Sequence, residues 1–207
     1  MRKFSTLLFA AALAACAPKA PITTQPVVDE RAQAVAAFET VRQVLQHPRC
    51  QNCHIPGDAP LQFDAGLPHQ MAVVRGEHGF GAAGLPCLTC HGESNPPASF
   101  GPQAPPGAPG WLLPPPEHKM VFINLSSAEL CKGVKNTQEN GGKDFDALIK
   151  HVAEDKLVLW GWNPGGARAQ VSVPHAEFVA AFKRWAAAGG PCPGDQMANV
   201  AMRTPAP

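Results

Sequence analysis

Two short cysteine–histidine motifs hold the residues of this sequence that are best suited to chemistry. Residues 50–54 are CQNCH and residues 87–91 are CLTCH, so the chain carries the C-x-x-C-H pattern twice. Two thiols at this spacing can bond the two vinyl groups on one porphyrin edge, and the next imidazole then ligates the iron from below. The sequence therefore predicts two covalently bound haem c groups, held by Cys50, Cys53, His54, Cys87, Cys90 and His91 with both histidines as proximal iron ligands.

A zinc site and a pair of redox-active dithiols are the alternatives to haem. Zinc sites built from two C-x-x-C pairs usually have 15 to 20 residues between the pairs, whereas 33 residues separate Cys53 from Cys87. A redox-active C-x-x-C pair needs no histidine after it. Both alternatives stay open at this point, but the repeated histidine and an export signal favour haem.

The sixth ligand of each iron decides what the centre can do. A second histidine or a methionine produces an electron carrier, whereas an open position permits chemistry on a bound molecule. His69 follows the first motif in a glycine-rich stretch that could fold across a porphyrin. His151 lies on a predicted amphipathic helix, and Met120 follows a proline-rich segment. Two irons offer at most two such positions, so at least one of these three candidates is not a ligand.

The three remaining cysteines suggest a lipid anchor and a disulfide. Cys16 ends the sequence Leu-Ala-Ala-Cys, which is similar to a bacterial lipobox, although a plain signal peptide with a stray cysteine is the alternative. Cys131 and Cys192 are then left over, and an even remainder in an oxidising compartment indicates a disulfide. Such a bridge would contribute on the order of 4 kcal/mol in the chain-entropy model. Two separate buried thiols are the alternative.

The N-terminal sequence predicts export. A short positive region precedes an apolar stretch that is too short to span a bilayer, which is typical of a secretory signal over residues 1–15. A Pro- and Thr-rich tether follows over residues 16–28. The protein is expected in the periplasm, attached to the membrane only through its lipid. Ala17 follows the lipidated cysteine where aspartate would retain the protein at the inner membrane, which favours the outer membrane.

Composition predicts a mainly α fold with long loops. The chain has 23 prolines and 19 glycines, and its 17 basic and 16 acidic residues form no basic patch that would bind nucleic acid. Apolar periodicity and capping residues predict helices over about 30–46, 127–131, 144–154 and 174–188. The proline-rich segment 95–116 is interpreted as a strap over a haem, with a simple spacer as the alternative. Residues 194–207 are expected to form a loose tail.

Several shorter motifs strengthen the prediction of a small dihaem cytochrome c domain over residues 29–193. The matching segments are residues 49–54, 57–62, 68–69, 75–76, 87–91, 106–109, 111, 120, 130–131, 140–142, 151–152, 160–162, 164–165 and 192–193. In these segments the chain resembles bacterial dihaem cytochromes that are described as the cytochrome subunit of isoquinoline 1-oxidoreductase-type molybdenum hydroxylases. The resemblance implies a redox protein partner, such as a molybdenum hydroxylase. One departure is Leu112, where the family pattern has a histidine after the tryptophan.

Electron transfer is the function that these features favour. A chain with two haems would relay single electrons between a periplasmic oxidoreductase and a respiratory acceptor, without being an enzyme itself. A peroxidase-like haem enzyme with one open iron position is the first alternative, although dihaem peroxidases are usually longer. A haem-based sensor is the second, but the sequence has no accompanying signalling domain.

Overall fold

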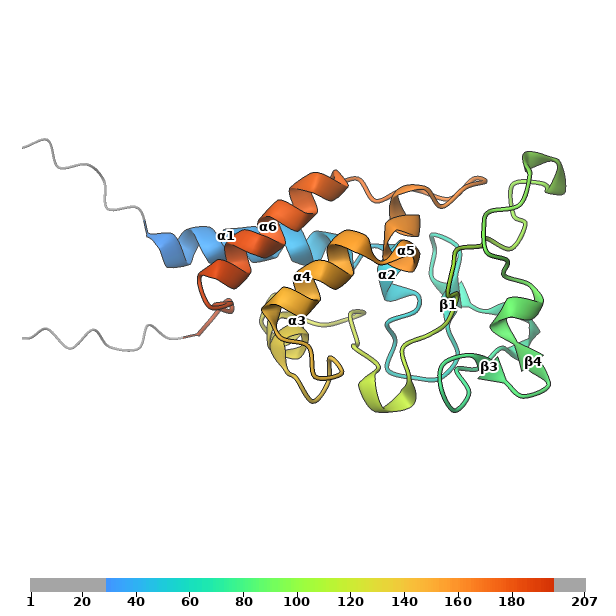
Figure 1. Cartoon of the computed structure of the whole chain (residues 1–207), viewed down its shortest axis with the longest axis horizontal. Coiled ribbons are helices and arrows are strands. Elements are labelled where there is room, and N and C mark those ends of the chain that lie inside the picture. The colour runs from blue at the N-terminus through green and yellow to red at the C-terminus, as the bar shows by residue number, and fades with distance from the viewer. Residues whose placement is uncertain (1–28, 196–207) are drawn as a thin grey trace, which may run out of the picture.

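The computed structural model describes residues 29–195 and separates them into a helical end and a loop end (Figure 1). The predicted signal peptide (1–15), the tether (16–28) with its lipidation site at Cys16, and residues 196–207 of the predicted tail lie outside the described residues. Within the described part of the chain, no helix has the length and apolar character needed to cross a membrane.

Four helices make up the helical end, and each forms where its capping residues and apolar spacing predicted. Asp29 accepts a hydrogen bond from the third residue of the first helix, and Ser126 and Glu129 form a reciprocal capping box on another. Figure 1 shows the first and last of these helices side by side. The bounds are α1 (Glu30–Leu45), α3 (Ser127–Lys135), α4 (Phe145–Glu154) and α6 (His175–Ala187).

An aromatic cluster fills the space between these helices. Trp185 is fully buried on α6, and its ring lies 4.9 Å from the ring of Phe38 on α1 and 5.3 Å from that of Phe145 on α4. Trp185 also donates a hydrogen bond of 3.1 Å from Nε1 to the carbonyl oxygen of Pro191. Burying large rings whose polar atoms are satisfied is a strong contribution to stability. The helical end therefore has its own core, and Cys50 of the first motif packs against the edge of that core.

A disulfide between Cys131 and Cys192 joins α3 to the segment that follows α6. Both half-cystines are fully buried in the same core. The bridge links residues that are 61 positions apart in the sequence, so it closes residues 131–192 into one loop.

The region around the first motif differs from its sequence-based prediction. After the helix that was predicted over about 30–46, Pro48 begins a second, short helix that was not predicted, α2 (Pro48–Gln51), with His47 as its N-cap. Proline is favoured at the first position of a helix because its missing N–H is not needed there. The apolar segment after α4 likewise forms α5 (Lys156–Leu159), capped by Asp155, and a 3₁₀ turn, η5 (Trp160–Trp162).

The loop end consists of two small hairpins and several 3₁₀ turns. Strand β2 leads directly into His69, and β4 leads directly into Cys87, so each hairpin delivers one candidate site residue. The two pairs are antiparallel, with Leu61 opposite Pro68 and Gly81 opposite Pro86. The bounds are β1 (Leu61–Gln62), β2 (Leu67–Pro68), β3 (Gly81–Ala82), β4 (Leu85–Pro86), η1 (Gln70–Ala72), η2 (Cys87–Thr89), η3 (Ala98–Phe100) and η4 (Pro116–His118).

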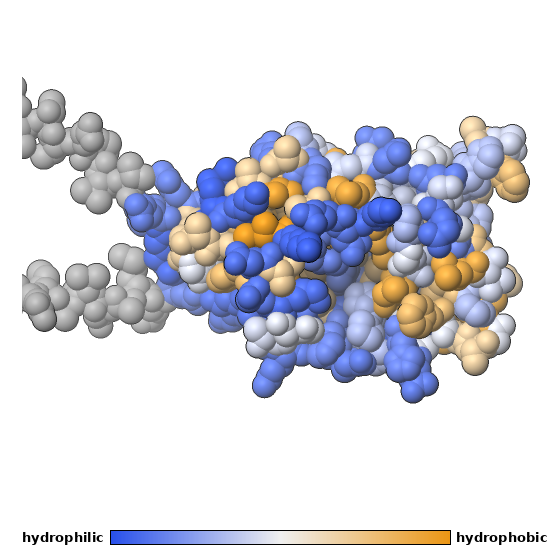
Figure 2. Space-filling model, viewed as in Figure 1, coloured by the Kyte–Doolittle hydropathy of each residue, from blue (hydrophilic) through white to orange (hydrophobic). Residues whose placement is uncertain are grey.

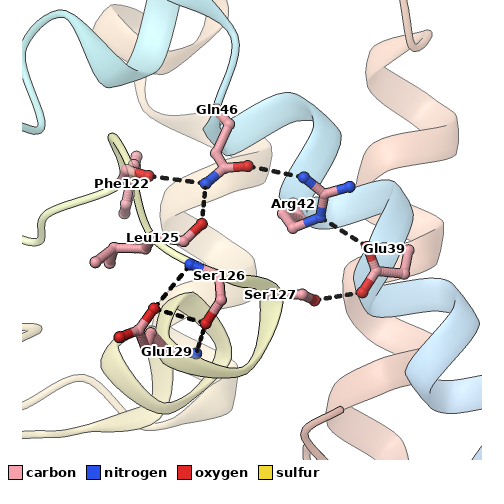
Figure 3. Close-up of polar contacts among 8 residues, drawn as sticks. All are labelled: Glu39, Arg42, Gln46, Phe122, Leu125, Ser126, Ser127 and Glu129. Atoms are coloured by element: carbon pink, nitrogen blue, oxygen red, sulfur yellow. Dashed lines mark hydrogen bonds and ion pairs between the residues drawn. The ribbon is translucent and has the colours of Figure 1, made fainter.

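A polar network ties α1 to the segment that precedes α3 (Figure 3). Gln46 donates from its side-chain amide to the carbonyl oxygens of Phe122 at 3.1 Å and Leu125 at 2.8 Å. Arg42 donates to the Gln46 side-chain oxygen at 2.8 Å and pairs with Glu39 at 2.7 Å. The network fixes the position of Phe122, which matters because this residue contacts the first motif.

Replacing Gln46 with methionine should lower the free energy of unfolding by about 1–3 kcal/mol, since two partly buried carbonyls lose their donor while side-chain volume is kept. Urea denaturation followed by circular dichroism measures the change. Gln43→Met is the matched control, because Gln43 is exposed on the same helix and its replacement should change stability by less than about 0.5 kcal/mol. Equal losses in the two variants would contradict the role given to Gln46.

Candidate functional site

Both C-x-x-C-H motifs adopt the same helical turn. The His54 amide donates to the Cys50 carbonyl at 3.2 Å, and the His91 amide donates to the Cys87 carbonyl at 3.0 Å. Side chains three positions apart lie on the same face of such a turn. In each motif the two thiols can therefore approach one edge of a flat ligand, while the histidine that follows extends from the end of the turn.

The two motif histidines are held by equivalent hydrogen bonds. Nδ1 of His54 lies 2.8 Å from the carbonyl oxygen of Met120, and Nδ1 of His91 lies 2.7 Å from that of Pro106. A carbonyl oxygen can only accept, so each Nδ1 carries the proton and each Nε2 keeps its lone pair. This is the arrangement that orients a metal-ligating histidine and raises its basicity as a ligand.

An aromatic ring stacks on each of these imidazoles. The Phe122 ring lies 3.9 Å from the His54 ring with 15° between their planes. The Trp111 ring lies 4.3 Å from the His91 ring with 6° between their planes. Each stack restricts rotation of the imidazole about its side-chain bonds, so Nε2 is held in one direction before any ligand binds.

Burial keeps both imidazoles neutral. It lowers the pKa of His54 to about 4, and the nearby His151 contributes to the same shift. Burial also lowers the pKa of His91. A histidine binds a metal only in its unprotonated form. Both motif histidines are therefore ready to act as ligands at neutral pH.

Burial has the opposite effect on the thiols because it disfavours their negative form. It raises the pKa of Cys50 to about 12 and that of Cys53 to about 11, and it also raises the pKa of Cys87. Redox-active C-x-x-C pairs depend on a thiol whose pKa is lowered to about 7 or less. The environment of these thiols therefore does not favour the dithiol alternative.

A cavity of about 280 Å³ lies between the two motifs. Its walls include Cys53 from the first motif and Cys87, Cys90 and His91 from the second, together with His69. Hydrophobic side chains gather at this end of the molecule, the right-hand end in Figure 2. The shape and lining suit a large apolar ligand that contacts both motifs.

Two arginines give this apolar cavity a positive side. Arg49 and Arg168 both line it. Burial lowers the pKa of Arg168, and the positive charge of the nearby Arg49 lowers it further. Asp64 pairs with Arg49. The buried Nε of Arg49 and the side-chain oxygen of Asn52 have no hydrogen-bond partner. The arginine N–H groups are donors that suit an apolar ligand carrying carboxylate groups, whereas the Asn52 oxygen needs a donor.

The proline-rich segment 95–116 lies against the second motif through His91, whose ring contacts it by both the hydrogen bond to Pro106 and the stack on Trp111. Asn95 anchors this segment, since its side chain accepts from Trp160 Nε1 at 3.1 Å and from the Gly107 amide at 3.2 Å. Segment 95–116 thus packs on the site, as the strap interpretation expects, but its relation to a haem stays a prediction.

The three candidate sixth ligands lie in different surroundings. His69 lies beside His91, with 6.2 Å between the ring centres. His151 lies on α4, near enough to His54 to affect its pKa, and pairs with Asp155 at 3.4 Å. The backbone carbonyl of Met120 accepts the hydrogen bond from His54, so Met120 is located at the Nδ1 side of that ring.

Other residues that support the site belong to no recognisable motif. Arg75 is almost fully buried and binds the loop after the first motif, and Phe122 stacks on His54. Two further histidines have structural partners: His47 accepts from the Arg49 amide, and His175 bonds the Val152 carbonyl at 2.9 Å. The contact of His47 is local, whereas the partners of Arg75, Phe122 and His175 are 18 or more residues away in the sequence, so only the structure reveals those roles.

The chemistry of both motifs fits the predicted haem c. Each offers two thiols on one face, a neutral imidazole with a free Nε2 and an aromatic ring that holds it, and the shared cavity combines apolar walls with two arginines. A structural zinc site needs four ligands around one ion. Across residues 29–195, no three His, Cys, Asp or Glu side chains gather closely enough to hold a metal ion.

Comparison of the chain with protein-family models, with curated proteins and with solved structures yields no match. The resemblance to dihaem cytochromes therefore remains a prediction from the motifs, and function has to be argued from the site itself.

Proposed function

We propose that the protein is a periplasmic dihaem c-type cytochrome that passes single electrons between a periplasmic oxidoreductase and a respiratory acceptor. The observation that carries this proposal is the equivalent construction of the two motifs. In each, the histidine donates from Nδ1 to a carbonyl and stacks on an aromatic ring, which leaves Nε2 as a fixed ligand. One such arrangement could arise from packing alone, but two arrangements with the same pattern indicate that both histidines have the same role as ligands.

The chain's own residues would hold and tune each centre. Haem c, when bound, supplies an iron that takes up and releases one electron. Cys50 and Cys53 would anchor the first group, and Cys87 and Cys90 the second. The Nδ1 hydrogen bonds keep the imidazoles basic, which stabilises the oxidised iron and so affects the potential. Cys53 and Cys87 line one cavity, so the two groups would be attached near each other.

The partners follow from the predicted location. The lipobox-like sequence at Cys16 supports attachment to a membrane facing the periplasm, with the outer membrane favoured. The likeness of the motifs to cytochrome subunits of molybdenum hydroxylases supports an enzyme of that class as the electron donor. A lipid-tethered carrier of this size would collect electrons from such an enzyme and deliver them to another cytochrome or an oxidase.

Counting the haems tests the proposal. The full chain, exported in a host with a c-type cytochrome maturation system, should gain the mass of two haems over the processed polypeptide. Cys87→Ala/Cys90→Ala and Cys50→Ala/Cys53→Ala are matched variants, and each should keep one haem. Electrospray mass spectrometry and the pyridine haemochrome spectrum measure the number. Bare thiols or bound zinc in the exported protein would overturn the proposal.

A second measurement separates an electron carrier from an enzyme. The reduced protein should be reoxidised by a one-electron acceptor, and the oxidised protein should be spectroscopically inert to hydrogen peroxide. A rapid reaction with peroxide at a high-spin haem would favour the peroxidase-like alternative.

A further inference from the structure

We infer that His69 is the sixth ligand of the iron held by the second motif, so that His91 and His69 bind the same metal from opposite sides. This inference rests on the proposed function, since it assumes a haem at Cys87 and Cys90. It assigns one of the three candidate residues to one of the two centres. His69 follows the first motif in the chain, but this assignment pairs it with the second motif.

The distance between the two rings fits this role. Their centres are 6.2 Å apart, with 62° between the planes. When one metal lies between two imidazole nitrogens at about 2 Å from each, the ring centres are about 6 Å apart. Both His69 and His91 line the cavity between the motifs, so a metal placed between the two rings would lie in that cavity.

The hydrogen bonds leave the correct nitrogen free on each ring. Nδ1 of His69 lies 2.7 Å from the carbonyl oxygen of Gln70, just as Nδ1 of His91 lies 2.7 Å from that of Pro106. Both carbonyls can only accept, so both rings carry the proton on Nδ1. Each ring therefore keeps the Nε2 lone pair that a metal requires.

A hairpin, a backbone hydrogen bond and an unusual turn hold His69 at the cavity. The hairpin of β1 and β2 ends at Pro68, and the His69 amide donates to the Pro60 carbonyl at 3.0 Å. The next turn places Met71 and Ala72 at φ values of 67° and 50°. Residues with side chains rarely adopt positive φ, and such strain is concentrated at functional sites.

Met71 is the main competitor for the same position. It also lines the cavity, and its thioether could ligate a haem iron. Its residue is 76% exposed, however, and the structure gives its side chain no anchor comparable to the hydrogen bonds of His69. A His–His pair would also give the second centre a lower reduction potential than a His–Met pair.

The test replaces His69 and Met71 separately in the haem-loaded full chain. In His69→Gly, one of the two haems should change from low-spin to high-spin, and added imidazole should restore it. Met71→Leu, the matched control from the same turn, should leave both spectra unchanged. Electron paramagnetic resonance and near-infrared magnetic circular dichroism follow the two centres separately. In His69→Met, the affected haem should stay low-spin with a raised potential.

The outcomes separate this inference from the proposed function. Two attached haems with an unaltered low-spin spectrum in His69→Gly would overturn the assignment and leave the cytochrome proposal intact. The same holds if Met71→Leu, rather than His69→Gly, produces the high-spin haem. If His69→Gly does not fold, the wild-type spectrum decides, because the absence of any bis-histidine signal overturns the assignment. A wild-type protein without covalent haem would overturn both.

Discussion

Replacing Arg75 with leucine should lower the free energy of unfolding by about 3–5 kcal/mol, because a buried charged network would lose its centre. The Arg75 side chain is 1% exposed. Its guanidinium donates to the carbonyl oxygens of Pro114, of Ile55 at 3.3 Å and of Gly57 at 3.0 Å. A buried carbonyl that loses its charged donor stays desolvated without a hydrogen bond, which destabilises the folded state.

The position of Arg75 explains why this loss of stability should also affect the first motif. Ile55 and Gly57 lie within three residues after His54, and Pro114 belongs to the proline-rich segment, so one side chain connects both regions. Asp58 lies 3.6 Å from the guanidinium but is largely exposed, so it contributes little. The neighbouring Gly76 has φ of 70°, and a Cβ there would be 1.9 Å from the Gly81 carbonyl oxygen, which fixes the turn that carries Arg75.

Urea denaturation of the haem-loaded protein, followed by far-ultraviolet circular dichroism, measures the change. Arg184→Leu is the matched control, since this arginine is exposed on α6 and its loss should alter stability by less than about 0.5 kcal/mol. Arg75→Lys should fall between wild type and leucine, because a lysine keeps the charge but lacks the planar set of donors. An Arg75→Leu variant as stable as the control would refute the role of this network.

Local signals were sufficient to predict the helical end. The capping residues Asp29 and Ser126 and the apolar spacing around Phe38 and Trp185 each depend on neighbours within a few positions. Helices α1, α4 and α6 accordingly begin and end within about two residues of the predicted bounds, whereas α3 continues to Lys135, beyond the short helix that was predicted. The short helix at Pro48 was not predicted, because proline is both a helix terminator and a favoured first residue.

The candidate site could be predicted only in part. The C-x-x-C-H spacing located the thiols and proximal histidines, since all of its information is local. The partners of those histidines are 66 and 15 residues away at Met120 and Pro106, and no periodicity connects such positions. The neighbourhood of His69 and His91 likewise depends on how a hairpin folds back. Long-range geometry in a loop-rich domain is therefore what the sequence alone could not supply.

Removing the disulfide should cost about 4 kcal/mol of unfolding free energy, which is the second large effect expected for this chain. The bridge between Cys131 and Cys192 spans 61 residues, so breaking it gives the unfolded chain a large gain in conformational freedom. Both positions are fully buried beside Trp185, and Cys131→Ala/Cys192→Ala also removes two sulfur atoms from that core. The loss should thus combine an unfolded-state effect with a smaller packing effect.

Comparing single and double variants separates these contributions. Cys131→Ala alone already breaks the bridge, so it should lose nearly as much stability as the double variant, and the difference between them measures the packing of the second sulfur. The urea m-value should rise in all bridge-free variants, because an unfolded chain without the cross-link exposes more surface. Tryptophan fluorescence, which a bound haem quenches in the folded state, follows the transition. A loss below about 1 kcal/mol with an unchanged m-value would mean that α3 and the end of α6 are held together by the aromatic core alone.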